Sequence, residues 1–135
     1  MRHLVKNIIS KKDAKILCTL NTIDFNNSII KNIISKLENI IGRVSLNKPS
    51  YLKIETSKNG HDWHKDTGTN NHMSWCNYGV SILLKKTNNS LFRYRNPKKK
   101  YTQEEHYLNA ILHSSDEWHM VEKPEKGRTV LLMFL

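Results

Sequence analysis

The feature that most constrains the fold is a change of hydrophobic period near residue 45. Before it, apolar residues recur at helical spacing, at positions 29, 30, 33, 34, 37, 40 and 41. From Tyr51 onward the apolar runs are short or alternating, and Asn, Gly, Pro and Lys separate them. An amphipathic helix followed by strands alone predicts an α+β domain in which the helix covers one face of a sheet.

The helical part has recognisable ends. Ser10 and Asp13 have capping-box spacing and predict a first helix over residues 11–20, after an opening strand at 4–9. Asn27 or Ser28 caps the second helix, and Gly42 ends it. The β part is predicted to form a sandwich or barrel from strands at 51–55, 61–66, 79–84, 90–94, 107–112, 118–121 and 129–135, with loops at 67–77 and 96–100 and turns at 57–60, 88–89 and 123–127.

Length and composition limit the class of protein. The 135 residues suit a single domain with one hydrophobic core. The sequence has no apolar run long enough to span a bilayer, and its N-terminus lacks a signal-peptide pattern. We therefore expect a cytoplasmic protein, in a host cell if the chain is viral, with no membrane partner. Cys18 and Cys76 are expected to be free thiols.

The net charge of +10 suggests an acidic partner such as nucleic acid. A competing explanation is compositional, because Lys, Asn and Ile, which have A/T-rich codons, supply 45 of the 135 residues. The basic stretch Lys98–Lys100 with Arg93 and Arg95 is likewise read either as an anion site or as a solvated loop. Both alternatives stay open.

His64 and Asp66 carry the clearest chemical signal. They are two residues apart, so on a strand they project from one face. His119, distant in sequence, is the candidate for a third ligand, and two imidazoles with one carboxylate form the open facial site of non-haem Fe(II) oxygenases. Arg128 begins an apolar run, where a buried guanidinium needs a carboxylate partner: an acidic co-substrate or a protein acid. A solvent-exposed strand is the alternative for the His-x-Asp pair, which arises by chance in about one such chain in four.

Further histidines and tryptophans flank these motifs. His61 is three residues before His64 and is expected on the opposite face of a regular strand, at the rim of the site. The histidines without a partner pattern are expected at the surface or behind the metal ligands; they are His72, His106 and His113. The tryptophans either pack in the core or line a substrate groove; they are Trp63, Trp75 and Trp118.

These motifs together resemble the 2-oxoglutarate/Fe(II)-dependent dioxygenase superfamily, in its prolyl-4-hydroxylase-like branch. The stretch Tyr51–Asp66 resembles the strand that leads to the family's His-x-Asp. The stretch His119–Arg128 resembles the distal histidine, the turn and the co-substrate arginine, and the first twenty residues are similar to the family's strand-plus-helix entry. The resemblance extends over nearly the whole chain.

The resemblance implies a double-stranded β-helix, or jelly roll, with two N-terminal helices packed on the major sheet. It implies one domain over residues 1–135, with helical support at 1–45 and the jelly-roll core at 49–135. His64, Asp66 and His119 would bind Fe(II), and no catalytic residue is expected beyond these ligands. Arg128 would bind 2-oxoglutarate, with Tyr78 or Tyr51 assisting. The enzyme would use O₂, with ascorbate as an optional reductant, release succinate and hydroxylate a protein or peptide side chain, prolyl by analogy.

The chain departs from the family pattern at three places: Asn88–Leu91 replaces a Gly-Gly-x-Leu turn, Val130 stands where a hydroxyl residue is common, and the tyrosine that commonly assists co-substrate binding is at no obvious position. Trp63 and Trp75 are the candidates for substrate contact. The alternative function is a non-catalytic jelly-roll module that binds a metal or nucleic acid. The intact triad and Arg128 argue against this alternative, since a closed structural zinc site would need four protein ligands. The oligomeric state is left open.

Overall fold

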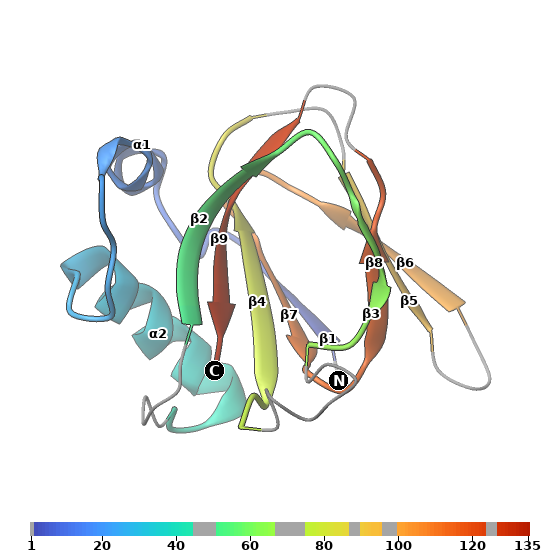
Figure 1. The fold of residues 1–135 in the computed structure, drawn as a ribbon. Coiled ribbons are helices and arrows are strands. Elements are labelled where there is room, and N and C mark those ends of the chain that lie inside the picture. The colour runs from blue at the N-terminus through green and yellow to red at the C-terminus, as the bar shows by residue number, and fades with distance from the viewer. Residues whose placement is uncertain (1, 45–50, 67–74, 87–89, 96–99, 124–126) are drawn as a thin grey trace.

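The computed structural model describes residues 2–44, 51–66, 75–86, 90–95, 100–123 and 127–135 (Figure 1). The predicted turn at 88–89, most of the predicted turn at 123–127, most of the loops at 67–77 and 96–100, and His72 lie outside these residues. The elements are β1 (Arg2–Val5), α1 (Lys11–Thr19), α2 (Ser28–Ile41), β2 (Tyr51–Ser57), β3 (His61–His64), β4 (Tyr78–Leu83), β5 (Ser90–Arg95), β6 (Lys100–Glu105), β7 (Ala110–Ser114), β8 (Trp118–Val121) and β9 (Arg128–Phe134).

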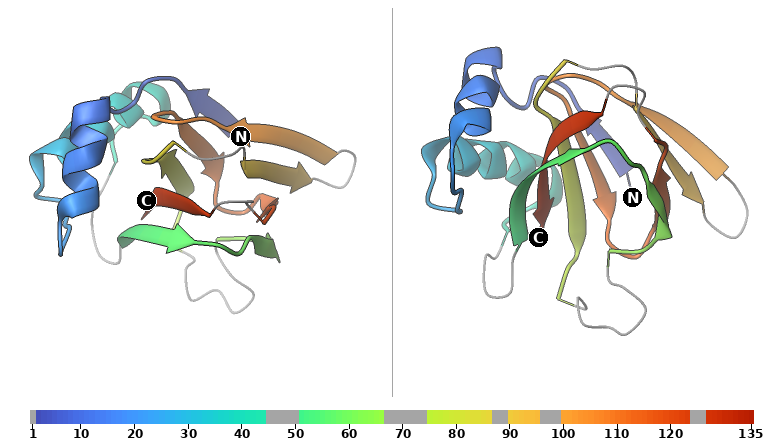
Figure 2. Two further views of the ribbon diagram at one scale, coloured as in Figure 1. Left: turned by 90° about the horizontal axis from the view of Figure 1, so that it is seen from above. Right: turned by 45° about the horizontal axis from the view of Figure 1, so that its top comes forward.

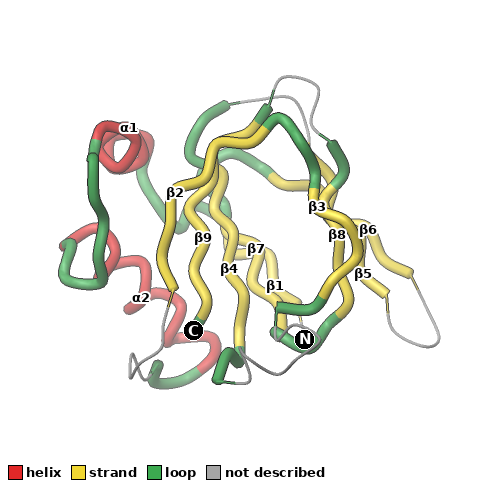
Figure 3. The backbone as a smooth tube through the Cα atoms, in the orientation of Figure 1, coloured by secondary structure: helices red, strands yellow, loops and turns green. Residues whose placement is uncertain are grey.

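The strands form two antiparallel sheets by nested pairing. β2 pairs with β9, β3 with β8, β4 with β7, and β5 with β6, so the strands from β2 to β9 fold back on themselves as one long wrapped hairpin. The five-stranded sheet has the order β1-β7-β4-β9-β2, and the four-stranded sheet has the order β3-β8-β5-β6. Figure 3 shows the two sheets facing each other, with both helices outside the larger one.

Both predicted helices are confirmed, with the expected caps. Ser10 Oγ accepts a hydrogen bond from the Asp13 N–H at 3.1 Å, which starts α1. Asn27 Oδ1 accepts from the N–H groups of Ile29 and Ile30 and so starts α2. Gly42 ends α2 with a φ of +80°, a conformation that costs glycine no steric strain.

The helices pack against the outer face of the five-stranded sheet (Figure 2). The buried side of α2 is formed by Ile30, Ile33, Ile34 and Leu37, as its period predicts. These side chains share a core with alternate residues of the sheet, namely Val80 and Ile82 of β4, Ala110 and Leu112 of β7, and Leu131 and Met133 of β9. The residues between them face the four-stranded sheet instead. The helices therefore cover only the outer face of the large sheet, and its inner face is turned toward the four-stranded sheet.

Strand β6 is the element that the sequence analysis did not predict. Its sequence, Lys-Tyr-Thr-Gln-Glu-Glu, lacks apolar alternation, and it forms the edge of the four-stranded sheet beside β5. The strand predicted at 107–112 is correspondingly shifted to Ala110–Ser114. An edge strand buries few side chains, so the hydrophobic pattern that indicates other strands is weak here.

Two smaller expectations are answered by the structure. Cys18 and Cys76 are free thiols, as predicted, and burial raises the pKa of the Cys76 thiol to about 11. Within the described residues, neither helix is long and apolar enough to cross a membrane.

Candidate metal centre

The nested pairing brings two of the predicted ligands, His64 and His119, together. His64 at the end of β3 is the cross-strand partner of His119 in β8, and their ring centroids lie 4.2 Å apart. Asp66 follows β3, and its N–H donates to the Ser115 carbonyl oxygen at 3.0 Å. That bond ties Asp66 to the segment between β7 and β8. Two of the candidate ligands therefore lie on paired strands, and the third is fixed by a backbone hydrogen bond to the turn between β7 and β8.

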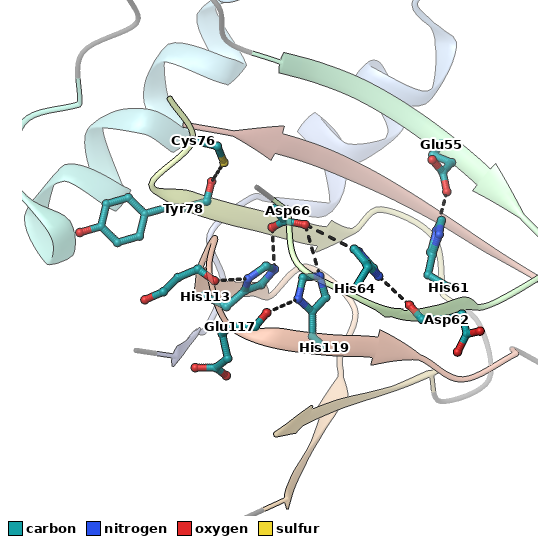
Figure 4. A network of polar contacts seen from close by, with 11 residues as sticks. Glu55, His61, Asp62, His64, Asp66, Cys76, Tyr78, His113, Glu117 and His119 are labelled. Atoms are coloured by element: carbon teal, nitrogen blue, oxygen red, sulfur yellow. Dashed lines mark hydrogen bonds and ion pairs between the residues drawn. The ribbon is translucent and has the colours of Figure 1, made fainter. Parts of the chain in front are cut away.

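The imidazoles of His64 and His119 converge on one carboxylate oxygen (Figure 4). Asp66 Oδ1 lies 3.3 Å from His119 Nε2 and 3.7 Å from His64 Nε2. One ligand atom from each of these residues lies within 4.8 Å of the others, a spacing that suits one metal ion. The structure thus assembles His64, Asp66 and His119, as the motif spacing predicted.

Backbone carbonyls orient both imidazoles. His64 Nδ1 lies 2.6 Å from the Asp62 carbonyl oxygen, and His119 Nδ1 lies 2.9 Å from the Glu117 carbonyl oxygen. A carbonyl oxygen only accepts, so each Nδ1 is placed to donate a hydrogen, and a metal ion bound at Nε2 would require the hydrogen there. Each Nε2 is then left with a lone pair directed at Asp66, the arrangement typical of histidines that bind a metal.

The electrostatics favour the protonation states that bind metals. Burial lowers the pKa of His64, so its imidazole is neutral at pH 7. Burial acts to raise the pKa of Asp66, but the adjacent imidazoles of His119 and His113 outweigh that effect, and the pKa of Asp66 is lowered. Neutral imidazole and ionised carboxylate are the forms that coordinate a cation.

His113 belongs to the same cluster; the sequence analysis left open whether it lies at the surface or behind the metal ligands. It is 3 % exposed, and its Nε2 lies 3.6 Å from Asp66 Oδ2. Burial lowers its pKa to about 4. A signal was present in the sequence, because His113 alternates with Ile111 on the inner face of an otherwise apolar strand. His106, in contrast, is exposed and lies 3.4 Å from Glu104.

A glycine makes room for this cluster. A Cβ atom added to Gly79 of β4 would collide with Asp66 Oδ2 and with the His113 ring. The backbone of β4 can therefore approach both side chains only because residue 79 has no side chain.

A cavity of about 200 Å³ between the two sheets joins the cluster to Arg128. Arg128 is 3 % exposed, its Nη2 donates to Ser81 Oγ at 3.3 Å, and its guanidinium lies 5.5 Å from the centre of the Phe92 ring. The lining contains residues of both sheets: Tyr51, Glu55, His61, His64, Asp66, Val80, Ser81, Phe92, His113, His119, Val121, Arg128, Leu132 and Phe134. Arg128 thus opens onto the same space as the candidate ligands.

The predicted tyrosine is placed elsewhere. Tyr78 packs against the core on the helix side and lines a separate hollow with Arg43 and Val44, so it does not line the cavity (Figure 4). The alternative, Tyr51, lines the cavity and stacks on Phe134 with ring centroids 5.1 Å apart. The tyrosine beside a bound co-substrate would therefore be Tyr51. Odd-even spacing within β4 separates the Tyr78 side chain from the cavity-facing Ser81.

His61 lines the cavity, although a regular strand would turn it away from His64. The register of β3 against β8 shifts between His61, opposite Val121, and His64, opposite His119. Three residues of β3 thus match two of β8, and this bulge returns His61 to the inner side, 3.0 Å from Glu55 Oε1. His61 is a lining residue at the half-exposed end of the cavity.

The two tryptophans predicted to contact substrate do not line the cavity. Trp63 projects to the outer side of the small sheet, where the Arg95 guanidinium lies 4.7 Å from its ring centroid. Arg95 also lies 5.1 Å from the exposed ring of Trp118. Trp75 is half-buried ahead of β4.

A divalent cation fits this centre. Asp66 is buried, and two imidazole lone pairs are directed at its Oδ1 atom. Without a cation these lone pairs repel one another, and with one they are all satisfied. A nitrogen-and-oxygen set of this kind suits Fe(II).

The chain is similar in fold to proteins of known structure. No protein-family model matches the chain, and no curated protein matches it. Among solved structures, the chain is similar to an oxidoreductase of the 2OG-Fe(II) oxygenase family from Burkholderia pseudomallei, with a TM-score of 0.57 and 14% identity over 82% of this chain and 52% of that one. The chain therefore spans about half the length of that protein.

A second similar structure is a Pseudomonas putida prolyl-4-hydroxylase, with a TM-score of 0.70 and 9% identity over 99% of this chain and 86% of that one. At these identities the likeness establishes a shared fold. The chain therefore has the fold of 2OG-Fe(II) oxygenases, including a prolyl-4-hydroxylase, as the resemblance in its motifs implied.

Proposed function

We propose that this protein is an Fe(II)- and 2-oxoglutarate-dependent oxygenase built on a jelly roll. The nested pairing of β2 with β9, β3 with β8, β4 with β7 and β5 with β6 supports that architecture, because a jelly roll is a wrapped antiparallel hairpin split between two sheets. The two N-terminal helices pack on the larger sheet, and this packing also supports the proposal.

One observation carries the proposal: the candidate ligands and a buried arginine share one cavity. His64, Asp66 and His119 would hold the iron by one side and leave the rest of it open to the cavity. Arg128 would bind the distal carboxylate of 2-oxoglutarate, since a guanidinium pairs well with a carboxylate in a site screened from water.

When bound, the iron would supply O₂ activation and the oxidative decarboxylation of 2-oxoglutarate to succinate. The protein supplies position and a dry site. Ser81 holds Arg128 by accepting from its Nη2, and the Phe92 ring covers the guanidinium. Val121 and Leu132 line the cavity beside them and exclude water, which strengthens the interaction of Arg128 with an anion.

We further propose that the substrate is a protein or peptide side chain, with a prolyl residue as the first candidate. The similarity in fold to the Pseudomonas putida prolyl-4-hydroxylase supports this choice by analogy. His61 and Tyr51 lie at the more exposed side of the cavity and would be the first residues that such a side chain meets.

The test is release of succinate from 2-oxoglutarate by the purified protein with Fe(II) and O₂, with and without proline-containing peptides. We expect succinate to form, more of it with an accepted peptide, and none from His119→Ala. The matched control is His106→Ala, which removes an exposed histidine and should leave the rate unchanged. Equal rates for wild type and His119→Ala would reject an iron oxygenase.

A second candidate is a non-catalytic module that binds nucleic acid. The outer side of the small sheet favours it, because the Arg95 guanidinium lies 4.7 Å from the Trp63 ring centroid and 5.1 Å from that of Trp118. Lys65 also lies 5.5 Å from the Trp118 ring centroid. Aromatic rings among cations suit single-stranded nucleic acid. Binding that weakens steeply with salt, is lost in Trp118→Ala and is unchanged in His64→Ala would support this function instead.

A further inference from the structure

Three histidines contact Asp66, but only two of them approach the same carboxylate oxygen. His64 and His119 approach Oδ1, whereas His113 Nε2 lies 3.6 Å from Oδ2. Oδ2 is buried, and no donor among the described residues lies at hydrogen-bond distance from it. A carboxylate that gives one oxygen to a metal usually receives a hydrogen bond on the other. His113 is placed to supply that bond.

The position of the hydrogen on His113 decides what this imidazole does. Its Nδ1 lies 3.1 Å from the Ser114 carbonyl oxygen, so a neutral ring has an acceptor on each side and one hydrogen to give. The carboxylate is the better acceptor, because a hydrogen bond to an ionised group is about twice as strong as one between neutral groups. In the metal-loaded site the hydrogen of His113 therefore belongs on Nε2. His64 and His119, whose Nε2 atoms would bind the metal, carry theirs on Nδ1.

We propose that His113 is a positioning residue, which donates a hydrogen bond from Nε2 to Asp66 Oδ2 and so restricts the carboxylate to one metal-binding oxygen. The inference rests on the metal site of the proposed function. A carboxylate that bound through both oxygens would occupy a position that the open facial site keeps for co-substrate and O₂. His113 thus fixes both the direction of Asp66 and the number of positions that the protein fills.

The packing around His113 and Asp66 leaves neither side chain room to move away from the other. His113 and Asp66 are 3 % and 6 % exposed. The backbone of β4 lies against both of them at Gly79, and the ring of His119 lies 4.2 Å from that of His113. Asp66 is also tied through its N–H to Ser115, two residues beyond His113. The Oδ2 atom therefore stays beside His113 whether or not a metal is bound.

The first experiment measures Zn(II) affinity, by competition with a chelator, for wild type, His113→Gln and His113→Met. The amide of Gln reaches about as far as Nε2 and can donate, whereas Met fills similar space and cannot. We expect His113→Met to bind Zn(II) 10- to 100-fold more weakly than wild type, and His113→Gln to stay within about threefold of it. Equal weakening of both variants, or of neither, would overturn the proposed role.

The second experiment needs no variant. Long-range proton–nitrogen NMR of the Zn(II)-loaded wild type should show His113 protonated at Nε2, and His64 and His119 protonated at Nδ1. His113 protonated at Nδ1 would overturn the inference, because its Nε2 would then have no hydrogen to donate to Asp66. Failure of the wild type to bind Zn(II) at all would reject the metal site itself. Normal binding without a difference between Gln and Met would reject only the role of His113.

Discussion

At the scale of single residues, the site depends on a glycine, because a side chain at position 79 would have no room. Gly79 allows β4 to lie against Asp66 and His113, and its function is spatial, since its φ is not in the left-handed region. Methyl groups inserted into well-packed sites typically cost about 1–3 kcal/mol because neighbours must move. Here the neighbours are a candidate metal ligand and the histidine that contacts it.

We therefore predict that Gly79→Ala weakens Zn(II) binding at least tenfold. Gly42→Ala is the matched control: its Cβ would meet nothing within 4 Å, but its φ of +80° is strained for alanine. That control should lower the free energy of unfolding by about 1 kcal/mol and leave metal affinity unchanged. Metal titration beside denaturant unfolding measures both, and unchanged Zn(II) affinity in Gly79→Ala would contradict the role given to this glycine.

A second prediction at this scale concerns pH. Burial lowers the pKa of His113 to about 4 in the folded protein, against about 6.5 in an unfolded chain. Between these values the unfolded state binds more protons, so the stability of the metal-free protein should fall as pH falls from 6.5 to 4. The contribution of His113 has a slope of at most about 1.4 kcal/mol per pH unit.

Urea unfolding with a chelator present, at several pH values, measures this slope. His113→Gln should flatten the dependence, and His106→Gln, at an exposed position, should not. A wild-type stability that is constant from pH 4 to 6.5 would show that His113 is not buried as a neutral group.

At the scale of elements, local sequence rules account for the helices. Asn27 satisfies two N–H groups at the start of α2, and the apolar period selects its buried side. We predict that Asn27→Ala lowers the free energy of unfolding by about 1 kcal/mol, as loss of a helix N-cap commonly does. Ser28→Ala, at the next and exposed position, should have little effect in the same denaturant titration; equal losses would contradict the assignment of Asn27 as the cap.

The same scale shows where sequence patterns give too little information. The strands that bury one or two faces were predicted within a few residues, because burial imposes alternation or continuous apolar runs. β6 was missed because an edge strand of Lys, Thr, Gln and Glu carries no such pattern. The bulge in β3 is also unmarked in the sequence, and it changed the side on which His61 lies.

At the scale of the whole molecule, the fold brings together groups that are far apart in the chain. His-x-Asp spacing indicated His64 and Asp66, and the second motif indicated His119 and Arg128; the nested strands place all four on one cavity. His113 lacked a motif of its own, and its role became visible only when β7 was placed beside Asp66. The choice between Tyr51 and Tyr78 likewise depended on whether each side chain projects toward the cavity or away from it.

The central claim is that one cavity holds Fe(II) on His64, Asp66 and His119 and 2-oxoglutarate on Arg128. The most direct measurement is an anaerobic absorption titration of the metal-free protein with Fe(II) and then with 2-oxoglutarate. We predict a weak visible charge-transfer band that needs both additions, disappears in His119→Ala, and requires at least tenfold more 2-oxoglutarate in Arg128→Gln. A folded wild type that binds Fe(II) but shows no band with 2-oxoglutarate would contradict the claim.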